Sequence, residues 1–253
     1  MNEVPPSRQL PPETIIEIWQ IDLETPLNPD IDLDTILSAD ERRRAERFIF
    51  ARDASQFKLT RAMLRLGLAS YLQERPQNIE LATNCHGKPR LAKNPSLHFN
   101  VTHSGGLALM AFATLGEVGV DVEAMQRNVE ALEIASPNFT KNETDMIARA
   151  QTTQEQTRIF LHLWTRKEAM LKAAGCGITR GLDTVDVSLG PVNLVRFSSA
   201  PGDIAESCWR VQDLDLIGGY IGAVSAPAGD WSIMLHTVRY EDVVNGRVPG
   251  GAS

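Results

Sequence analysis

Two short segments that carry acidic residues constrain the fold of this chain most. The first is Gly119-Val120-Asp121-Val122-Glu123, where two carboxylates stand two residues apart inside an apolar run. On a strand, residues i and i+2 lie on the same face, so both carboxylates point one way. The second segment, Trp164–Lys172, is typical of a helix, and Trp164, Glu168 and Lys172 follow one another at four-residue spacing along one side of it. A fold that brings this strand and this helix together makes a pocket with three carboxylates.

Such a pocket is suited to a metal ion. Asp121, Glu123 and Glu168 would offer hard oxygen ligands, and magnesium that holds a phosphate takes the rest of its shell from water and substrate. Arg166 and Lys167, together with Lys172, would surround Glu168 with cations that grip phosphate oxygens. The residues alone also allow a plainer interpretation, in which the strand has an exposed acidic face and Glu168 forms a surface salt bridge with Lys172.

Composition limits the class of protein. The chain has 253 residues, of which 43% are hydrophobic and 23% are charged, as is typical of a soluble globular protein. Its net charge of −7 argues against general binding to nucleic acid, and no apolar run approaches the ~18–20 residues of a membrane span. The first residues do not have the pattern of a signal peptide, and Cys85, Cys176 and Cys208 form neither a metal-ligand pattern nor a disulfide frame. We therefore expect a cytoplasmic protein that binds neither nucleic acid nor membrane.

The patterns along the chain predict a mixture of helices and strands. Residues 1–13, rich in proline, are expected to form a loose arm, and residues from about 241 a flexible, glycine-rich tail. Ser38–Glu41 and Thr140–Glu143 are capping boxes that begin helices. Hydrophobic periodicity predicts helices at 40–49, 53–73, 129–135, 140–150 and 155–174, and strands at 14–23, 79–82, 97–101, 108–114, 118–123, 218–224 and 231–238. We divide the chain into an N-terminal half, 1–117, and a C-terminal half, 118–253.

Three further segments offer contacts for an anion. A strand runs into the turn Thr102-His103-Ser104-Gly105-Gly106, which presents consecutive donors, although a simple turn with a capping hydroxyl fits as well. Gly87-Lys88-Pro89 is a tight turn with a cation, and Arg44 belongs to an arginine-rich helix that is usually a solvated face. The chain has neither a Gly-x-x-x-x-Gly-Lys loop nor a Gly-x-Gly-x-x-Gly motif, so it is not expected to be a Walker nucleotidase or a Rossmann enzyme.

Taken in order, these segments resemble the surfactin-synthetase-activating type of 4′-phosphopantetheinyl transferases. The family motifs correspond here to Gly87-Lys88-Pro89, Phe99–Ser104, Gly119–Glu123 and Trp164–Gly175, and the similarity extends upstream through Arg61–Arg65. The resemblance implies an α+β fold of two similar halves in a pseudo-twofold arrangement, with coenzyme A bound between them. It also implies an enzyme that transfers the 4′-phosphopantetheine arm of coenzyme A to a serine of an apo carrier protein and releases 3′,5′-ADP. Such an enzyme depends on magnesium and is expected to be a monomer.

The resemblance also implies roles for single residues. Asp121, Glu123 and Glu168 would hold magnesium, and Lys172 would contact the pyrophosphate. The other coenzyme A contacts would be Thr102, His103 and Arg44 at the 3′-phosphate and Lys88 beside the adenosine. Glu143 matches a further active-site acid of some members, so the proton acceptor is left open between Glu168, Glu143 and a metal-bound water. Glu41 and Phe57 depart from the family pattern, since some relatives carry a base and a hydroxyl there.

The carrier and its pathway stay open, because the sequence does not distinguish acyl, peptidyl and aryl carriers of fatty acid, polyketide or nonribosomal peptide synthases. We expect the carrier to dock on residues 124–142. Two other functions compete with the transferase, namely a coenzyme A or carrier-binding module without turnover and a magnesium-dependent hydrolase of diphosphates. Intact acidic residues at 121, 123 and 168 argue against the first, since a decayed site would lose its ligands early.

Overall fold

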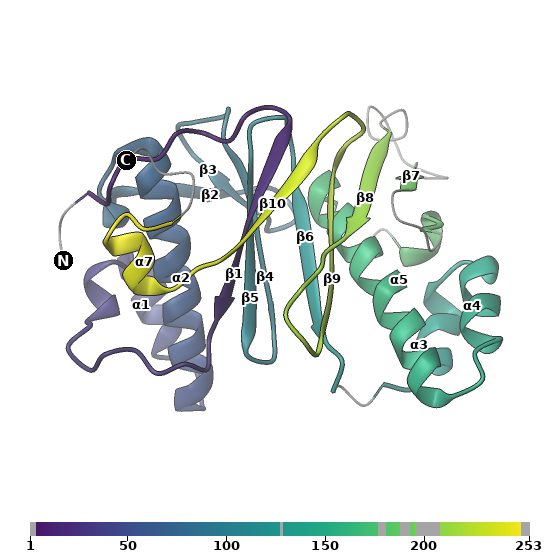
Figure 1. Cartoon of the computed structure of the whole chain (residues 1–253). Helices are drawn as coiled ribbons and strands as arrows, with labels where there is room; N and C mark the ends of the chain where they lie inside the picture. Colours follow the sequence, from purple (N-terminus) through teal and green to yellow (C-terminus); the bar gives the residue numbers. More distant parts are fainter. Residues whose placement is uncertain (1–3, 127–128, 177–180, 188–192, 196–207, 249–253) are drawn as a thin grey trace.

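The computed structural model describes residues 4–126, 129–176, 181–187, 193–195 and 208–248. The chain forms four layers, in which two sheets lie side by side in the middle and helices cover the outer face of each (Figure 1). The C-terminal helix α7 (Tyr240–Val244) lies beside the helices of the first half (Figure 1). No helix in the described ranges is long and apolar enough to cross a membrane.

The first half consists of a four-stranded sheet, a long helix and smaller elements. The sheet has the order β10-β1-β5-β4. Its elements in chain order are β1 (Ile15–Asp22), η1 (Leu33–Thr35), α1 (Ala39–Ala45), α2 (Ala51–Leu72), η2 (Pro76–Asn78), β2 (Leu81–Thr83), β3 (Pro89–Leu91), β4 (His98–Ser104) and β5 (Leu107–Ala113).

The second half repeats this plan. Its elements are β6 (Gly119–Ala124), α3 (Ala131–Asn138), α4 (Lys141–Ala148), α5 (Thr153–Ala174), η4 (Leu182–Thr184), β7 (Asn193–Val195), β8 (Trp209–Asp213) and β9 (Tyr220–Pro227), followed by β10 (Ser232–Thr237) and α7 (Tyr240–Val244). Its sheet has the order β6-β9-β8-β7, so β6-β9-β8 corresponds to β1-β5-β4 of the first half, and both sets are antiparallel. Each half also carries one helix of 22 residues, α2 or α5. The predicted α+β fold of two similar halves is confirmed.

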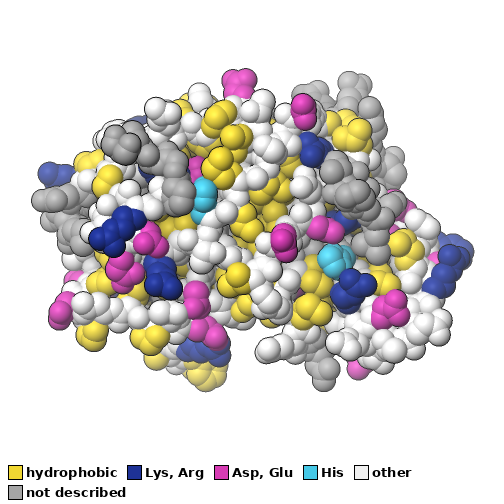
Figure 2. Space-filling view, in the orientation of Figure 1, with side chains coloured by type: hydrophobic (Ala, Val, Ile, Leu, Met, Phe, Trp, Pro, Cys, Tyr) yellow, Lys and Arg dark blue, Asp and Glu magenta, His cyan; other side chains and the backbone are white. Residues whose placement is uncertain are grey.

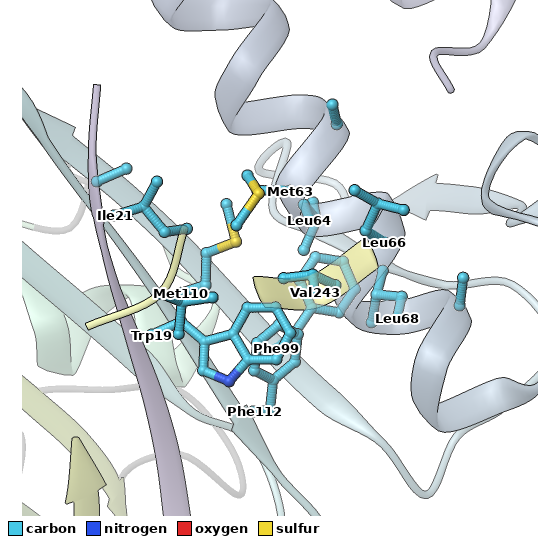
Figure 3. Close-up of a cluster of buried hydrophobic side chains, with 14 of the residues drawn as sticks. Trp19, Ile21, Met63, Leu64, Leu66, Leu68, Phe99, Met110, Phe112 and Val243 are labelled. Atoms are coloured by element: carbon cyan, nitrogen blue, oxygen red, sulfur yellow. The ribbon is translucent and has the colours of Figure 1, made fainter. Parts of the chain in front are cut away.

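Strand alternation explains the layers. In β1, Ile16 and Ile18 face the second sheet, whereas Trp19 and Ile21 face α2. The first core, between α2 and the first sheet, is built around Trp19 and Phe112, whose ring centroids lie 5.2 Å apart (Figure 3). A second cluster fills the space between the sheets, and a third lies beneath α5. Both faces of the central strands are therefore buried, which fits their continuous apolar runs.

The two chain ends differ from the sequence-based expectation. Arg8, in the expected loose arm, is buried, forms an ion pair with Glu17 and donates to the Val248 carbonyl oxygen at 2.9 Å. The flexible tail expected from about residue 241 stays a prediction, although α7 and the residues after it place Val243, labelled in Figure 3, and Val248 in the first core. Residues 249–253 lie outside the described ranges.

The C-terminal segment also crosses the predicted division of the chain. Residue 118 precedes β6 directly, but β10 pairs in parallel with β1, so residues 232–237 belong to the first sheet. The two halves are therefore tied together by the end of the chain, and the boundary at 117 and 118 stays a prediction.

Candidate active site

Strand β6 presents its two carboxylates to α5. Val120 and Val122 on the opposite face are buried in the cluster between the sheets, so Asp121 and Glu123 point towards the helix. Gly119 allows this close approach, because a Cβ atom there would lie 2.0 Å from the Ala169 carbonyl oxygen of α5. Asp121 is 5% exposed, and Glu123 is half-buried.

Helix α5 supplies the other two groups. Glu168 and Lys172 are one turn apart, and Gly175 ends the helix in a left-handed conformation. The Lys172 ammonium does not pair with Glu168 as in the surface salt bridge considered above. It donates to Asp121 Oδ1 at 2.5 Å, and it lies 3.3 Å from Thr102 Oγ1.

Two buried carboxylate oxygens in this site have no hydrogen-bond partner among the residues that the structure describes. They are Asp121 Oδ2 and Glu168 Oε1. Burial raises the pKa of Glu168 to about 7, since the favourable charge of Lys172 is opposed by the charges of Asp121 and Glu123. Burial likewise raises the pKa of Asp121, against the effect of Lys172. The negative charge of the site is therefore incompletely compensated by protein groups.

The donor set fits a hard cation, because it consists of carboxylate oxygens, and two of these are buried without a partner among the described residues. As they stand, no three His, Cys, Asp or Glu side chains in the described part of the chain are arranged to hold a metal ion. Lys172 and Thr102 bind Oδ1 of Asp121 directly. A metal ion at this position would have to share Asp121 with the ammonium of Lys172.

Strand β4 lies beside β6 and contributes hydroxyl groups. The Thr102 hydroxyl donates to Asp121 Oδ1 at 3.0 Å, and the Ser104 hydroxyl donates to Glu123 Oε2 at 2.8 Å. His103, between them, is exposed on the other face of the strand. The side chains of Thr102 and His103 therefore point to opposite faces of β4. Ser104 has a contact to the site that the sequence analysis did not predict. The signal was present in the alternation of polar residues along β4.

Lys88, in the turn before β3, lies beside the C-terminal end of α5, where its ammonium donates to the Ala173 carbonyl oxygen at 3.3 Å. Its ammonium pairs with Glu117 and donates to the Val118 carbonyl oxygen at 3.1 Å. Burial lowers the pKa of Lys88, although its bond to Glu117 opposes this effect. Burial would raise the pKa of Glu117, but hydrogen bonds from His98 and Lys88 lower it to about 2. The structure thus places the Lys88 ammonium between the start of β6 and the end of α5, in contact with Glu117.

Four other predicted contributors lie elsewhere. Arg44 is exposed, and its guanidinium lies 5.2 Å from the centre of the Phe57 ring. Arg166 binds Asp213 through two hydrogen bonds, of 2.7 and 2.8 Å. The prediction that Arg166 and Lys167 surround Glu168 is wrong, because successive residues of a helix point about 100° apart.

Glu143 and Lys167 form a buried ion pair at 2.7 Å, in which Glu143 is 0% exposed. The Glu143 carboxylate also accepts from the Thr140 backbone N–H and from Val187. Its oxygens are therefore bound to groups of the fold, and a role as a further active-site acid stays a prediction.

Comparisons with known proteins agree with this geometry. Residues 117–225 match the model of the 4′-phosphopantetheinyl transferase superfamily, and residues 26–115 match the model of the N-terminal part of a 4′-phosphopantetheinyl transferase. A Synechocystis sp. protein provisionally named as such a transferase is 33% identical over 203 residues, which cover 79% of this chain and 80% of its own. The 4′-phosphopantetheinyl transferase HetI of Nostoc sp. is 30% identical over 85% of this chain and 89% of its own. Sfp of Bacillus subtilis is 29% identical over 90% of this chain and all of its own.

The chain therefore belongs to the 4′-phosphopantetheinyl transferase family. It is a transferase enzyme, and the resemblance to the 4′-phosphopantetheinyl transferases is confirmed. The boundary between the two matched segments, at residues 115–117, falls between β5 and β6.

Proposed function

We propose that this enzyme transfers the 4′-phosphopantetheine arm of coenzyme A to a serine hydroxyl of an apo carrier protein and releases 3′,5′-ADP, with magnesium as cofactor. One observation carries the proposal. Asp121 and Glu168, from a strand and a helix distant in sequence, each bury a carboxylate oxygen that has no partner in the described part of the chain, beside the ammonium of Lys172. Acidic and cationic groups side by side suit a polyanionic substrate that arrives with a divalent cation.

The residues of the site have distinct roles in this proposal. Asp121, Glu123 and Glu168 would hold magnesium, which supplies positive charge against the pyrophosphate oxygens when it is bound. Lys172 would move from Asp121 to the pyrophosphate and stabilise the charge that develops on the leaving group. The serine that attacks comes from the carrier, so the transferase needs no nucleophile of its own.

Glu168 is suited to accept the proton of that serine. A general base works best when its pKa is near the operating pH, and in the absence of a metal burial brings the pKa of Glu168 to about 7, a value that a bound cation would lower. Glu143 and a metal-bound water are the other candidates that the resemblance leaves open, and Glu143 already binds Lys167 and backbone groups.

The contacts to the adenosine and 3′-phosphate of coenzyme A are proposed from the family resemblance and not from the geometry. Lys88 beside the adenosine and His103 with Arg44 at the 3′-phosphate are proposed on the resemblance, and the exposure of His103 and Arg44 leaves both accessible to a ligand. Thr102 is proposed with them, although its hydroxyl proton points to Asp121 and must be redirected before it binds a phosphate.

The carriers we propose are acyl, peptidyl or aryl carriers of fatty acid, polyketide or nonribosomal peptide synthases. We further propose a cytoplasmic monomer of the surfactin-synthetase-activating type that binds neither nucleic acid nor membrane. In support, basic and acidic side chains alternate over the face drawn in Figure 2 instead of gathering by sign. Residues 124–142 remain the proposed docking surface, where Ile134 is exposed and residues 127 and 128 lie outside the described ranges.

The test is to incubate the protein with coenzyme A, magnesium and an apo carrier and to weigh the carrier by mass spectrometry. Transfer adds about 340 Da per modified serine, the mass of the arm in the family reaction. Release of 3′,5′-ADP is followed in parallel by chromatography, and EDTA should abolish both signals until magnesium is restored. Binding without a mass gain would identify a binding module, and cleavage of coenzyme A without a modified carrier would identify a hydrolase.

Variants of the carboxylates test the site itself. Asp121→Asn and Glu168→Gln should each reduce turnover by orders of magnitude while the protein stays folded, because they remove charge without changing volume. Glu143→Gln is the informative contrast, since it breaks a buried ion pair and should lower stability as well as activity. Near-normal turnover of Glu168→Gln would remove the helix from the proposed site.

A further inference from the structure

Strands β4 and β6 are edge strands of different sheets, and they face each other across the site. No strand pairing joins them within the described residues. Edge strands leave backbone groups unpaired, so these groups need other partners. Here, side chains of β4 provide them.

The contacts follow every second residue of β4. Asn100 Oδ1 accepts from the Val120 N–H at 2.9 Å, and the Thr102 hydroxyl donates to Asp121 Oδ1. Ser104 completes the series with two bonds, since its oxygen accepts from the Ala124 N–H at 3.2 Å while its proton goes to Glu123 Oε2 at 2.8 Å. Because β4 side chains alternate, all three come from the same face of the strand.

We propose that Ser104 is a positioning residue that orients Glu123 for metal binding. This inference rests on the proposed function, in which Glu123 is a metal ligand. A hydroxyl has a single proton, and the bond from the Ala124 N–H leaves that proton directed at the Glu123 carboxylate. The strand of the first half thereby fixes a ligand that belongs to the second half.

The need for such a bond follows from the environment of Glu123. It is half-buried at the end of β6, whereas Asp121 is held by Thr102 and Lys172 inside the structure. A glutamate side chain loses much rotamer freedom when a ligand fixes it. Ser104 removes part of that freedom in advance, and groups that orient metal ligands typically change metal affinity 10–100-fold.

The experiment measures metal binding directly, without turnover. Mn²⁺ is titrated into the full-length protein and followed by electron paramagnetic resonance, which reports the free ion. Ser104→Ala should raise the Mn²⁺ dissociation constant about tenfold or more. Ser104→Thr keeps the hydroxyl on a residue that favours strands, so its dissociation constant should equal that of the wild type. Ser70→Ala is the matched control, because it removes a buried hydroxyl bonded to the Gly67 carbonyl oxygen in α2 and should leave the constant unchanged.

A second variant separates positioning from general damage. In a Glu123→Gln background, Ser104→Ala should have no further effect on the Mn²⁺ constant, whereas a merely structural role would weaken binding again. Melting temperatures in EDTA show whether each variant is folded. If the alanine variant is not, Ser104→Val, which lacks the hydroxyl but has the shape of threonine, carries the test against Ser104→Thr. An unchanged constant in folded Ser104→Ala would overturn this inference alone. Wild-type protein that binds no Mn²⁺ would overturn both the inference and the metal part of the proposed function.

Discussion

Replacing Glu168 by glutamine should stabilise the metal-free protein at pH 8, although the same change should abolish activity. The pKa of Glu168 is about 7 in the folded protein, against an ordinary value of 4.5. Between these values the folded state binds more protons than the unfolded state, so stability falls as the pH rises. Below pH 4.5 the carboxyl is neutral in both states and contributes nothing to this dependence.

The size of the effect follows from the shift. Each unit of pKa corresponds to 1.36 kcal/mol, so ionised Glu168 reduces the free energy of unfolding by about 3 kcal/mol at most. A side chain that is only 7% exposed is little screened by solvent, and most of that limit should be retained. Glutamine keeps the volume but carries no charge, and we expect a melting temperature roughly 5–10 °C above that of the wild type in EDTA at pH 8.

The assay is thermal and urea unfolding at pH 5 and pH 8, in EDTA and then with magnesium. The gap between the two proteins should be small at pH 5, large at pH 8, and reduced again by magnesium, which binds and stabilises the wild-type site. Exposed Glu13→Gln is the control and should show no such pattern. An equal gap at both pH values, or a less stable Glu168→Gln at pH 8, would refute the reasoning.

Three other changes test neighbouring parts of the argument. Gly119→Ala places a Cβ atom 2.0 Å from a carbonyl oxygen in α5, so it should lower the free energy of unfolding in urea titrations by about 1–3 kcal/mol or more. Gly218→Ala is the control and should not lower it, because no atom lies within 4 Å of the added Cβ. Lys172→Met should bind Mn²⁺ more tightly than the wild type in titrations, because it removes a cation that competes for the same carboxylate; weaker binding would contradict this. His103→Ala should raise KM for coenzyme A about tenfold and spare dephospho-coenzyme A in steady-state assays, since a contact between charged groups contributes ~1.5–3 kcal/mol; equal losses would show that the 3′-phosphate is not its partner.

Local patterns were sufficient to predict most elements of the fold. Capping boxes at Ser38 and Thr140 begin α1 and α4, and both are formed as predicted. The alternation in Gly119–Glu123 predicted both the strand and the face on which its carboxylates lie. Side chains of a strand alternate between two faces, so burial of the valines on one face places the carboxylates on the other. These patterns span only a few residues, and such local patterns can be recognised in a single sequence.

Partners distant in the sequence could not be predicted in this way. Lys167 looked like a phosphate-binding cation, but it is buried against Glu143, 24 positions earlier on another helix. The tail looked flexible because of its glycines, yet Val243 and Val248 fill a core whose other side is formed near residue 19. Helix geometry alone, at about 100° per residue, would have separated Lys167 from the face of Glu168.

The site also explains why the two halves must act together. Asp121, Glu123 and Glu168 all come from the second half, but the hydroxyls that contact the two β6 carboxylates come from β4 of the first. The last strand of the chain returns to pair with β1, which fixes the sheets relative to one another and so fixes β4 against β6. Since a displacement of about 1 Å at a reacting group can reduce rates a hundredfold, the distant pairing of β10 with β1 bears on catalysis as well as on stability.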